Sequence, residues 1–421
     1  MILKVNRLII IHIDTLRREY PYCYLLKKGF EQLGYRVLLV SRRNIRAVLN
    51  IVLPEILIVS HCFSLSSDFM RKIKDKTDIY VIGVEAIGDG SYMWPYDYPE
   101  EVDLRSFKGI FLWNRYFRDW LIQNREIASE RVYCVGSPRV SMSKYIEKKN
   151  TNVIGFVGRF EFLNTFDKRP ALTNLINMKD DRRHFLYRFF AEVEGAVIYG
   201  DIIDYLINSG FKVSIRPHPQ ECESTYNVLK DKYKGKLAVD DSADYLGWLE
   251  SVGLIVATLS TSLTEAYLIG KPIISVDRMF KENYMIHYDK WMENYMSIAY
   301  APSSLEEVKE LFKNDLNAKR SSPEMDEYLE RHYNIKGDQG FDALEKIVRV
   351  IHKESGTGNR CPWVRYMFVR VMFFHLDIIL LIRSYFRKTL YREFHYNYCC
   401  FWNKPSSFMK RAAAKFVASL K

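Results

Sequence analysis

Short apolar runs alternate with amphipathic segments along the first half of the chain. The runs "RLIIIHI", "YRVLLVS", "EILIVSH" and "IYVIGVEA" are rich in β-branched residues, and helix-like segments separate them. Such runs predict parallel strands that are covered on both faces. The pattern continues to "RVYCVGSP", where Gly136 and Pro138 mark the end of a strand. We therefore expect a doubly wound α/β domain over residues 1–145.

The polar stretch 143–152 reads as a linker, after which the pattern starts again. The second set of strands is predicted in "VIGFVG", "FKVSIRP", "KLAVDD", "GLIVATLS" and "KPIISVD". The expected α/β fold thus has two Rossmann-like domains, 1–145 and 151–300, that face a central cleft. A helical segment, 301–355, is expected to pack partly on the first domain.

The C-terminal segment 356–421 carries most of the net charge. It holds 12 Lys or Arg and 2 acidic residues, a net +10 of the chain's +11. This distribution disfavours a nucleic-acid-binding surface and indicates a local anionic partner. Arg370, His375 and Asp377 interrupt every candidate transmembrane span, so we expect a basic, aromatic helical tail that lies on the anionic inner membrane surface. The basic residues assigned to this contact are Arg365, Arg370, Arg383, Arg387 and Lys388. The alternative is an amphipathic helix pair docked on the protein itself.

Seven scattered cysteines show no metal-ligand spacing and read as reduced thiols. The N-terminal apolar run lacks a small-residue cleavage site and reads as a first strand. We therefore expect a cytoplasmic protein, peripherally attached to the inner face of the membrane.

The stretch "VSIRPHPQE" places a charged loop directly after a predicted buried strand. Arg216 can fork onto phosphate oxygens, and His218 can donate to a phosphate or a leaving group. Pro217 and Pro219 hold the loop rigid. The alternative is a structural histidine between prolines that end the strand.

A hydroxyl-rich segment follows about forty residues later. The strand "LIVA" ends in Thr258, and Ser260, Thr261 and Ser262 come just before a predicted helix. Hydroxyls and backbone N–H groups at such a place favour an anion, and Glu265 can accept from ribose hydroxyls. The alternative is N-capping by Ser262, with Glu265 as its capping-box partner.

These segments carry a resemblance to known enzymes. The Ser/Thr cluster, Glu265 and "GKP" (Gly270, Lys271, Pro272) resemble the nucleotide-binding segment of GT-B glycosyltransferases and UDP-GlcNAc 2-epimerases. "RPHP" resembles the His-Pro motif of bacterial GT-B transferases that use CMP-activated acid sugars, the sialyltransferases and β-Kdo transferases. The resemblance implies that His218, Pro219 and the hydroxyl cluster hold the phosphate of a donor nucleotide.

The same families carry an acidic motif that supplies a catalytic carboxylate. This chain offers "VEAIGDG", with Glu85 and Asp89, and Gly88 stands where the first acid would be. The resemblance implies that Asp89 or Glu85 takes the proton of the acceptor hydroxyl or acts as a nucleophile. The alternative is an ordinary turn Asp before Gly90.

Arg159, in "GFVGRFE", lies at the first strand-to-helix turn of the second domain. This position commonly meets donor phosphates in the fold, and an Arg neutralises them without a metal. An ion pair with Glu161 or Asp167 is the alternative. His12, Asp14 and His61 follow strands of the first domain, where we expect structural or acceptor-positioning roles.

The sequence therefore predicts a metal-independent GT-B glycosyltransferase with no cofactor. Its predicted partners are a nucleotide sugar, preferably CMP-Kdo or a related CMP-nonulosonic acid, and a bacterial surface polysaccharide or glycolipid acceptor. Three alternatives stay open: a UDP-sugar transferase, a polyol-phosphate transferase of the teichoic-acid type, and a non-catalytic membrane-binding scaffold.

Overall fold

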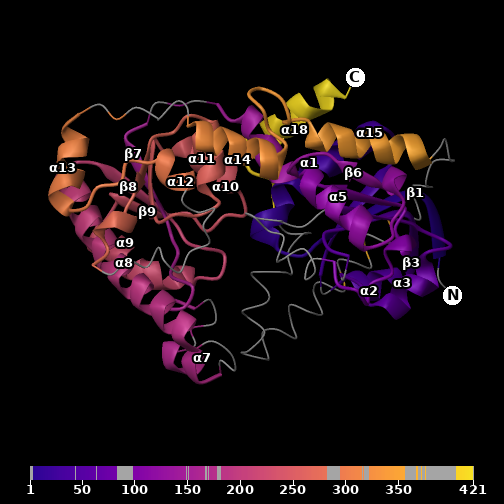
Figure 1. Cartoon of the computed structure of the whole chain (residues 1–421), viewed down its shortest axis with the longest axis horizontal. Coiled ribbons are helices and arrows are strands. Elements are labelled where there is room, and N and C mark those ends of the chain that lie inside the picture. The colour runs from indigo at the N-terminus through magenta and orange to yellow at the C-terminus, as the bar shows by residue number, and fades with distance from the viewer. Residues whose placement is uncertain are drawn as a thin grey trace. The chain divides into compact units, whose positions relative to one another are not determined.

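The computed structural model divides the chain into two compact units. Unit 1 comprises residues 1–145 and 328–421, and unit 2 comprises residues 146–327. The structure describes residues 3–420 except for several short stretches and most of the C-terminal segment (Figure 1). Within this range the structure does not describe residues 43, 63, 83–97, 148, 150, 166, 167, 169, 178–181, 282–293, 315 and 317–321. It also does not describe residues 356–403, apart from Met367, Val371 and His375.

Unit 1 contains a parallel sheet with the order β2-β1-β3-β4-β5-β6. Strand β1 lies in the interior of this sheet and pairs with β2 and β3, so Ile9, Ile10 and Ile11 are fully buried. Apolar residues on both faces of β1 are what a doubly wound sheet requires. The strands are β1 (Leu3–Ile13), β2 (Arg36–Ser41), β3 (Val52–Val59), β4 (Asp78–Ile82), β5 (Gly109–Leu112) and β6 (Val132–Cys134).

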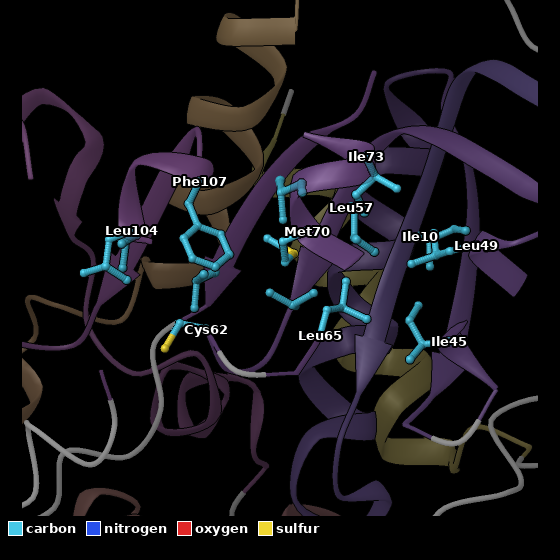
Figure 2. Packing of buried hydrophobic residues seen from close by; sticks show 14 of the residues in the cluster. Ile10, Ile45, Leu49, Leu57, Cys62, Leu65, Met70, Ile73, Leu104 and Phe107 are labelled. Carbon is cyan, nitrogen blue, oxygen red and sulfur yellow. The ribbon is translucent and has the colours of Figure 1, made fainter. Parts of the chain in front are cut away.

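Helices cover this sheet and close its core. Figure 2 shows Ile10 of β1 and Leu57 of β3 near Leu49 of one helix and Ile73 of another. Removal of this apolar surface from water stabilises the unit. The α-helices described within the first 145 residues are α1 (Leu16–Gln32), α2 (Ile45–Leu49), α3 (Ser67–Ile73), α5 (Arg115–Asn124) and α6 (Pro138–Ser141).

Helix α15 (Ala343–Ser355) belongs to unit 1 and packs on α1 and α6 through its buried face. Tyr80 of β4 donates a hydrogen bond to Oε2 of Glu354 at 2.8 Å, and Tyr133 of β6 donates to Oε1 of the same carboxylate. Lys144 pairs with Glu345 at 2.8 Å. Helix α14 (Pro323–Tyr333), which precedes α15, contains the division between the two units.

The last helix, α18 (Ser407–Ser419), packs on α1 of the same unit (Figure 1). Ser406 caps it by accepting from the backbone N–H of Met409 at 3.0 Å. Phe416 is fully buried, and its ring lies so close to Gly29 that a Cβ there would approach within 2.7 Å. This part of the segment expected to lie on a membrane is therefore docked on the protein, because its apolar face is buried against α1.

Unit 2 contains a second parallel sheet with the order β11-β10-β7-β8-β9. Its strands are β7 (Val153–Val157), β8 (Lys212–Arg216), β9 (Leu237–Val239), β10 (Leu254–Ala257) and β11 (Ile273–Ser275). Its helices are α7 (Ala171–Asn177), α8 (Arg182–Asn208), α9 (Asn227–Lys232), α10 (Tyr245–Ser251), α11 (Leu263–Leu268), α12 (Asn294–Ser297) and α13 (Leu305–Lys313).

The two sheets and their helices confirm the α/β fold expected from the sequence. Every strand pair in both units is parallel across the described residues, as the long connections between apolar runs predict. None of the described helices is both long and apolar enough to cross a membrane.

Candidate nucleotide-phosphate site

Three loops follow neighbouring strands at the carboxyl edge of the second sheet. The register sets Val157 of β7 beside Arg216 of β8, and β10 pairs with β7 on its other side. Because the strands are parallel, loops 158–165, 217–222 and 258–262 leave the sheet at one edge. Of the predicted phosphate ligands, Arg159, His218, Pro219 and Ser260–Ser262 lie on these three loops, Arg216 ends β8, and Glu265 lies in α11.

A close approach joins the loops after β7 and β8. The backbone N–H of Gly158 donates to the carbonyl of Arg216 at 2.7 Å. A Cβ at Gly158 would lie 2.8 Å from both carboxylate oxygens of Glu221 and 3.1 Å from the backbone nitrogen of His218. Glycine at this position therefore lets the carboxylate of Glu221 lie between the two loops.

His218 has one ring nitrogen directed toward its own loop. Its Nδ1 accepts from the backbone N–H of Gln220 at 3.2 Å and lies 3.9 Å from Oε2 of Glu161. The neutral ring consequently carries its proton on Nε2. Since 37% of the side chain is exposed, the ring is accessible from the carboxyl edge of the sheet.

Arg159 connects the loop after β7 with the loop after β10. Its guanidinium donates to the backbone carbonyl of Leu259, one residue before the hydroxyl cluster. The backbone N–H of Leu259 donates in turn to Asp277 at 2.8 Å, which lies just after β11. Burial raises the pKa of Asp277, although Ser275, Leu259 and Arg159 oppose the shift. The side chain of Arg159 is thus held beside residues 260–262.

The hydroxyl cluster is half-buried at the start of α11. Oγ of Ser260 and Oγ of Ser262 lie 2.5 Å apart, and Tyr245 donates to the carbonyl of Ser262 at 2.6 Å. Ser262 stands at the N-cap, but its side chain makes no capping hydrogen bond, so the capping box considered for Ser262 and Glu265 is not formed. Thr261 is half-buried, whereas Glu265 is fully buried at 0% exposure.

Arg216 is buried and is held by the loop that follows β9. Its guanidinium pairs with the carboxylate of Asp240 and donates to Oγ of Ser242 at 3.1 Å, and its side chain is 7% exposed. These contacts tie the end of β8 to the loop after β9. The other two predicted ligands of this motif differ, because His218 and Pro219 are only half-buried. A donor-binding role for Arg216 stays a prediction.

Two further carboxylates lie behind His218. Glu161 pairs with Arg188, and although burial raises its pKa, His218, Arg188 and Arg159 together hold that pKa below its ordinary value. Glu192 accepts the backbone N–H groups of Phe162 and Leu163 at 2.9 and 2.8 Å. Burial and the carboxylate of Glu161 raise the pKa of Glu192 to about 8. At neutral pH the pair therefore contains one charged and one protonated carboxyl group.

Unit 1 has a polar cluster at the carboxyl edge of its own sheet. Side-chain ligand atoms of Asp14, Glu19 and His61 lie within 4.8 Å of one another. Arg18 pairs with Glu19 at 2.9 Å and Arg42 with Asp14 at 3.3 Å, so two guanidinium groups balance the two carboxylates. We therefore assign no metal to this cluster.

The ionisation of this cluster follows from its burial. Burial lowers the pKa of His12 to about 4, so the ring is neutral at pH 7. Burial raises the pKa of Asp14, but His61, Arg42 and His12 outweigh it and bring the pKa to about 2. The structural or acceptor-positioning roles expected of His12, Asp14 and His61 stay predictions.

Several predicted residues lie outside the described residues. Both candidate catalytic carboxylates, Glu85 and Asp89, belong to this group, as do the five basic residues assigned to the membrane: Arg365, Arg370, Arg383, Arg387 and Lys388.

Sequence reasoning missed the residue that organises the site. Glu221 is fully buried, its Oε1 accepts from the backbone N–H of Phe160 at 2.7 Å, and Tyr226 donates to its Oε2. Burial raises its pKa to about 7, although Tyr226 and backbone N–H groups oppose the shift. Its position three residues after His218 was the available signal, but a carboxylate in a loop does not by itself indicate burial.

Comparisons with known proteins identify the fold. No family model matches the chain, and no curated protein is detectably similar in sequence. A solved variant of the wall teichoic acid polymerase TagF is 11% identical with a TM-score of 0.50, and the match covers 83% of this chain and 88% of that one. UDP-GlcNAc 2-epimerases also match. The enzyme from Methanocaldococcus jannaschii is 12% identical (TM-score 0.44, 83% and 99% covered), and that from Neisseria meningitidis, bound to UDP-GlcNAc, is 13% identical (TM-score 0.43, 83% and 100% covered).

These identities are informative about the fold and not about activity. The chain has the GT-B fold, with two α/β units that each contain a parallel sheet.

Proposed function

We propose that the protein is a glycosyltransferase that moves a sugar from a nucleotide-activated donor to a glycan or glycolipid of a bacterial surface. One observation carries the proposal: three adjacent strand ends of the second sheet bring Arg159, His218 and the hydroxyl cluster to one edge. A guanidinium, a ring N–H and hydroxyl groups are the donors that a phosphate accepts. The GT-B fold supports the assignment, since open α/β sheets bind ligands at this edge.

The reaction requires stabilisation of the leaving nucleotide phosphate. In the proposed mechanism the bond between the anomeric carbon and the phosphate oxygen breaks, and the acceptor oxygen bonds to that carbon. Nε2–H of His218, the guanidinium of Arg159 and the hydroxyl groups of Ser260–Ser262 stabilise the charge on the phosphate. Asp89 or Glu85 accepts the proton of the acceptor hydroxyl. The reaction proceeds without a metal.

The preferred donor is a CMP-activated acid sugar such as CMP-Kdo. The support is the resemblance of "RPHP" to the His-Pro motif of enzymes that use such donors. A UDP-sugar transferase would share the Glu265 and "GKP" segment but would not need this motif. The acceptor would reach the enzyme at the cytoplasmic face of the membrane, which the basic segment 356–403 would contact.

A second candidate is transfer of a polyol phosphate from a CDP-activated donor. The observation that favours it is the fold likeness to the wall teichoic acid polymerase TagF at a TM-score of 0.50. Both candidates place a cytidine nucleotide on the second sheet. They differ in products, because the first forms a glycosidic bond and the second a phosphodiester.

The test is a thermal-shift panel of CMP, CDP, UDP and GDP on the wild type, His218→Ala and the control His375→Ala, which removes an exposed histidine. Stabilisation by CMP that is lost only in His218→Ala supports the proposal. Stabilisation by CDP with release of CMP from a CDP-polyol favours the second candidate. A response to UDP alone indicates a UDP-sugar enzyme, and no response to any nucleotide contradicts transferase function and favours a membrane-binding scaffold.

A further inference from the structure

The two oxygens of the Glu161 carboxylate face different groups. Arg188 of α8 donates to Oε1. Oε2 is buried and has no hydrogen-bond partner among the residues that the structure describes. It lies 3.9 Å from Nδ1 of His218, which is within the range of an ion pair and beyond that of a hydrogen bond. A small rotation of the imidazole ring would therefore join the two atoms.

Helix α8 holds Glu161 from two positions one turn apart. The guanidinium of Arg188 pairs with the carboxylate and lies over the ring of Phe162, 4.3 Å from its centroid. Glu192, four residues later, accepts the backbone N–H groups of Phe162 and Leu163 at 2.9 and 2.8 Å. Residues four apart share one face of a helix. Side chain and backbone at Glu161 are both held, so Oε2 stays beside His218.

The protonation state of the His218 ring decides what Oε2 can accept. In the neutral ring Nδ1 accepts from the backbone N–H of Gln220 at 3.2 Å and has no proton to offer. A second proton on the ring goes to Nδ1, which then becomes a donor and needs an acceptor. Oε2 of Glu161 is the carboxylate oxygen at 3.9 Å. Gln220 is exposed, so its N–H can turn to water instead.

The charges around Glu161 fit the protonated ring. Burial raises the pKa of Glu161, but His218, Arg188 and Arg159, in that order, lower it, and the net shift is downward. Attraction between two charges is mutual, so a ring that favours the ionised carboxylate is itself favoured in its charged form.

Two further carboxyl groups lie in this part of the site, and neither takes the same role. Glu192 has a pKa of about 8, so it is protonated at neutral pH and offers His218 no charge. Glu221 accepts the backbone N–H of His218 and not its ring. Glu161 is thus the carboxylate that faces the imidazole ring.

We propose that Glu161 is a positioning residue that holds His218 as an imidazolium when the nucleotide phosphate binds. Nδ1–H then donates to Oε2 of Glu161, and Nε2–H donates to the phosphate from a ring that carries a full positive charge. Because the ring of the free protein is neutral, binding takes up one proton from solution. The inference rests on the proposed function, in which His218 meets that phosphate.

The first test needs no nucleotide. Nitrogen-detected magnetic resonance of the imidazole rings of the full chain follows His218 between about pH 5 and pH 9, and His218→Ala assigns its signals. In Glu161→Gln the midpoint of the His218 titration should fall by roughly half a pH unit or more, because the amide carries no charge. A merely structural role of Glu161 would not move this midpoint.

Glu192→Gln is the matched control for this titration. It replaces a neighbouring carboxyl group that is uncharged at neutral pH and keeps the acceptor for Phe162 and Leu163. The midpoint of His218 should therefore stay at its wild-type value. Equal midpoints in the wild type and Glu161→Gln overturn the proposal, and so does a fall of the same size in both variants.

The second test counts the protons that bind together with CMP. Titration calorimetry at about pH 7.5, in two buffers of different ionisation enthalpy, should show an uptake of at least about half a proton by the wild type. The uptake should be lost in Glu161→Gln and in His218→Ala. Glu221, with a pKa of about 7, is another group that can take up a proton. Uptake that persists in His218→Ala overturns the proposal, and this comparison decides even if Glu161→Gln does not fold.

The two tests separate this inference from the proposed function. CMP binding without proton uptake overturns the role of Glu161 and leaves the nucleotide site intact. If the wild type binds no nucleotide, the proposed function is contradicted, whereas the titration of His218 still decides whether Glu161 pairs with the ring.

Discussion

Oε1 of Glu221 accepts a hydrogen bond from the backbone N–H of Phe160 at 2.7 Å, across two loops that follow neighbouring strands. One of these loops carries Arg159 and the other carries His218. A fully buried carboxyl group therefore fixes the position of one candidate phosphate ligand relative to the other. Tyr226, which donates to Oε2, holds the carboxyl group in place.

Replacement of Glu221 by Ala should destabilise this edge of the sheet. The N–H of Phe160 would be left buried without its acceptor, which costs about 1–3 kcal/mol of unfolding free energy. Glu221→Gln should lose less, because its amide oxygen still accepts from Phe160. Chemical denaturation measures both variants against the exposed control Glu306→Ala. If Glu221→Ala loses no more unfolding free energy than this control, the hydrogen bond between Phe160 and Glu221 does not contribute to stability.

Gly158→Ala should disturb both folding and nucleotide binding. The added Cβ lies 2.8 Å from both oxygens of Glu221, which its hydrogen bonds hold in place, so the loops must move apart. Overpacking of this kind typically costs about 1–3 kcal/mol. Calorimetric titration with CMP should show a loss of affinity of at least tenfold. Gly200→Ala is the control, because a Cβ there meets nothing within 4 Å; equal CMP affinities in the two variants would contradict the argument.

The two arginines of the site should respond differently to replacement by Lys. Arg216 is buried and its guanidinium donates to Asp240 and Ser242, so Arg216→Lys keeps the charge but loses the fork of donors and should lower the unfolding free energy by about 1–2 kcal/mol. Arg159→Lys should change stability by less than about 1 kcal/mol and weaken nucleotide binding instead. Denaturation and CMP titration of both variants measure the contrast. The reverse pattern would assign the phosphate to Arg216.

Glu192 should make unit 2 less stable as the pH rises. Its pKa is about 8 in the folded chain against an ordinary 4.5, so folding favours the protonated form. Its contribution is therefore complete below pH 4.5 and is lost as the pH rises through 8. Glu192→Gln keeps the acceptor for Phe162 and Leu163, so its unfolding free energy should fall less between these values. Glu221, with a pKa of about 7, titrates in the same pH range, so the unfolding free energy of the variant should still fall somewhat with pH. If the unfolding free energy falls equally with pH in the wild type and the variant, the assignment to Glu192 is contradicted.

Phe416→Ala should destabilise unit 1. The ring is fully buried against Gly29 of α1, and truncation of a buried Phe costs about 3–5 kcal/mol. Thermal unfolding measures the loss, with Ala414→Ser at an exposed position of the same helix as control. If α18 instead served membrane attachment, Phe416→Ala would unfold at the same temperature as the control variant and would lose binding to anionic vesicles.

The periodicity of apolar residues was sufficient to predict both sheets. Strands such as β1 and β10 are buried on both faces, so their sequences are uninterrupted apolar runs, and only helical crossovers can join parallel strands of this kind. The loop after β8 could also be predicted, because Pro217 and Pro219 are local signals that end a strand.

The roles within the candidate site were less predictable. Sequence reasoning gave Arg159 a donor-phosphate role, with an ion pair to Glu161 or Asp167 as the alternative. That its guanidinium reaches the carbonyl of Leu259, one hundred residues away, was not predicted. Arg216 and His218 stand two positions apart, yet one side chain is buried in an ion pair and the other is partly exposed. Arg216 is buried because its guanidinium pairs with Asp240 in the loop after β9. No local sequence pattern specifies the position of that loop, so the sequence does not show which of the two side chains is accessible to a ligand.

The sequence by itself determined the strands, most helices and the places where polar loops follow strands, because these depend on apolar periodicity and on Gly and Pro within a few residues. Only the tertiary structure decided that Glu221 lies between two loops, that α18 docks on α1, and that Arg216 is buried in an ion pair while His218 is partly exposed. Each of these depends on which elements become neighbours. Sheet order and helix packing bring together residues that are far apart in the chain, and side-chain burial is decided by those neighbours.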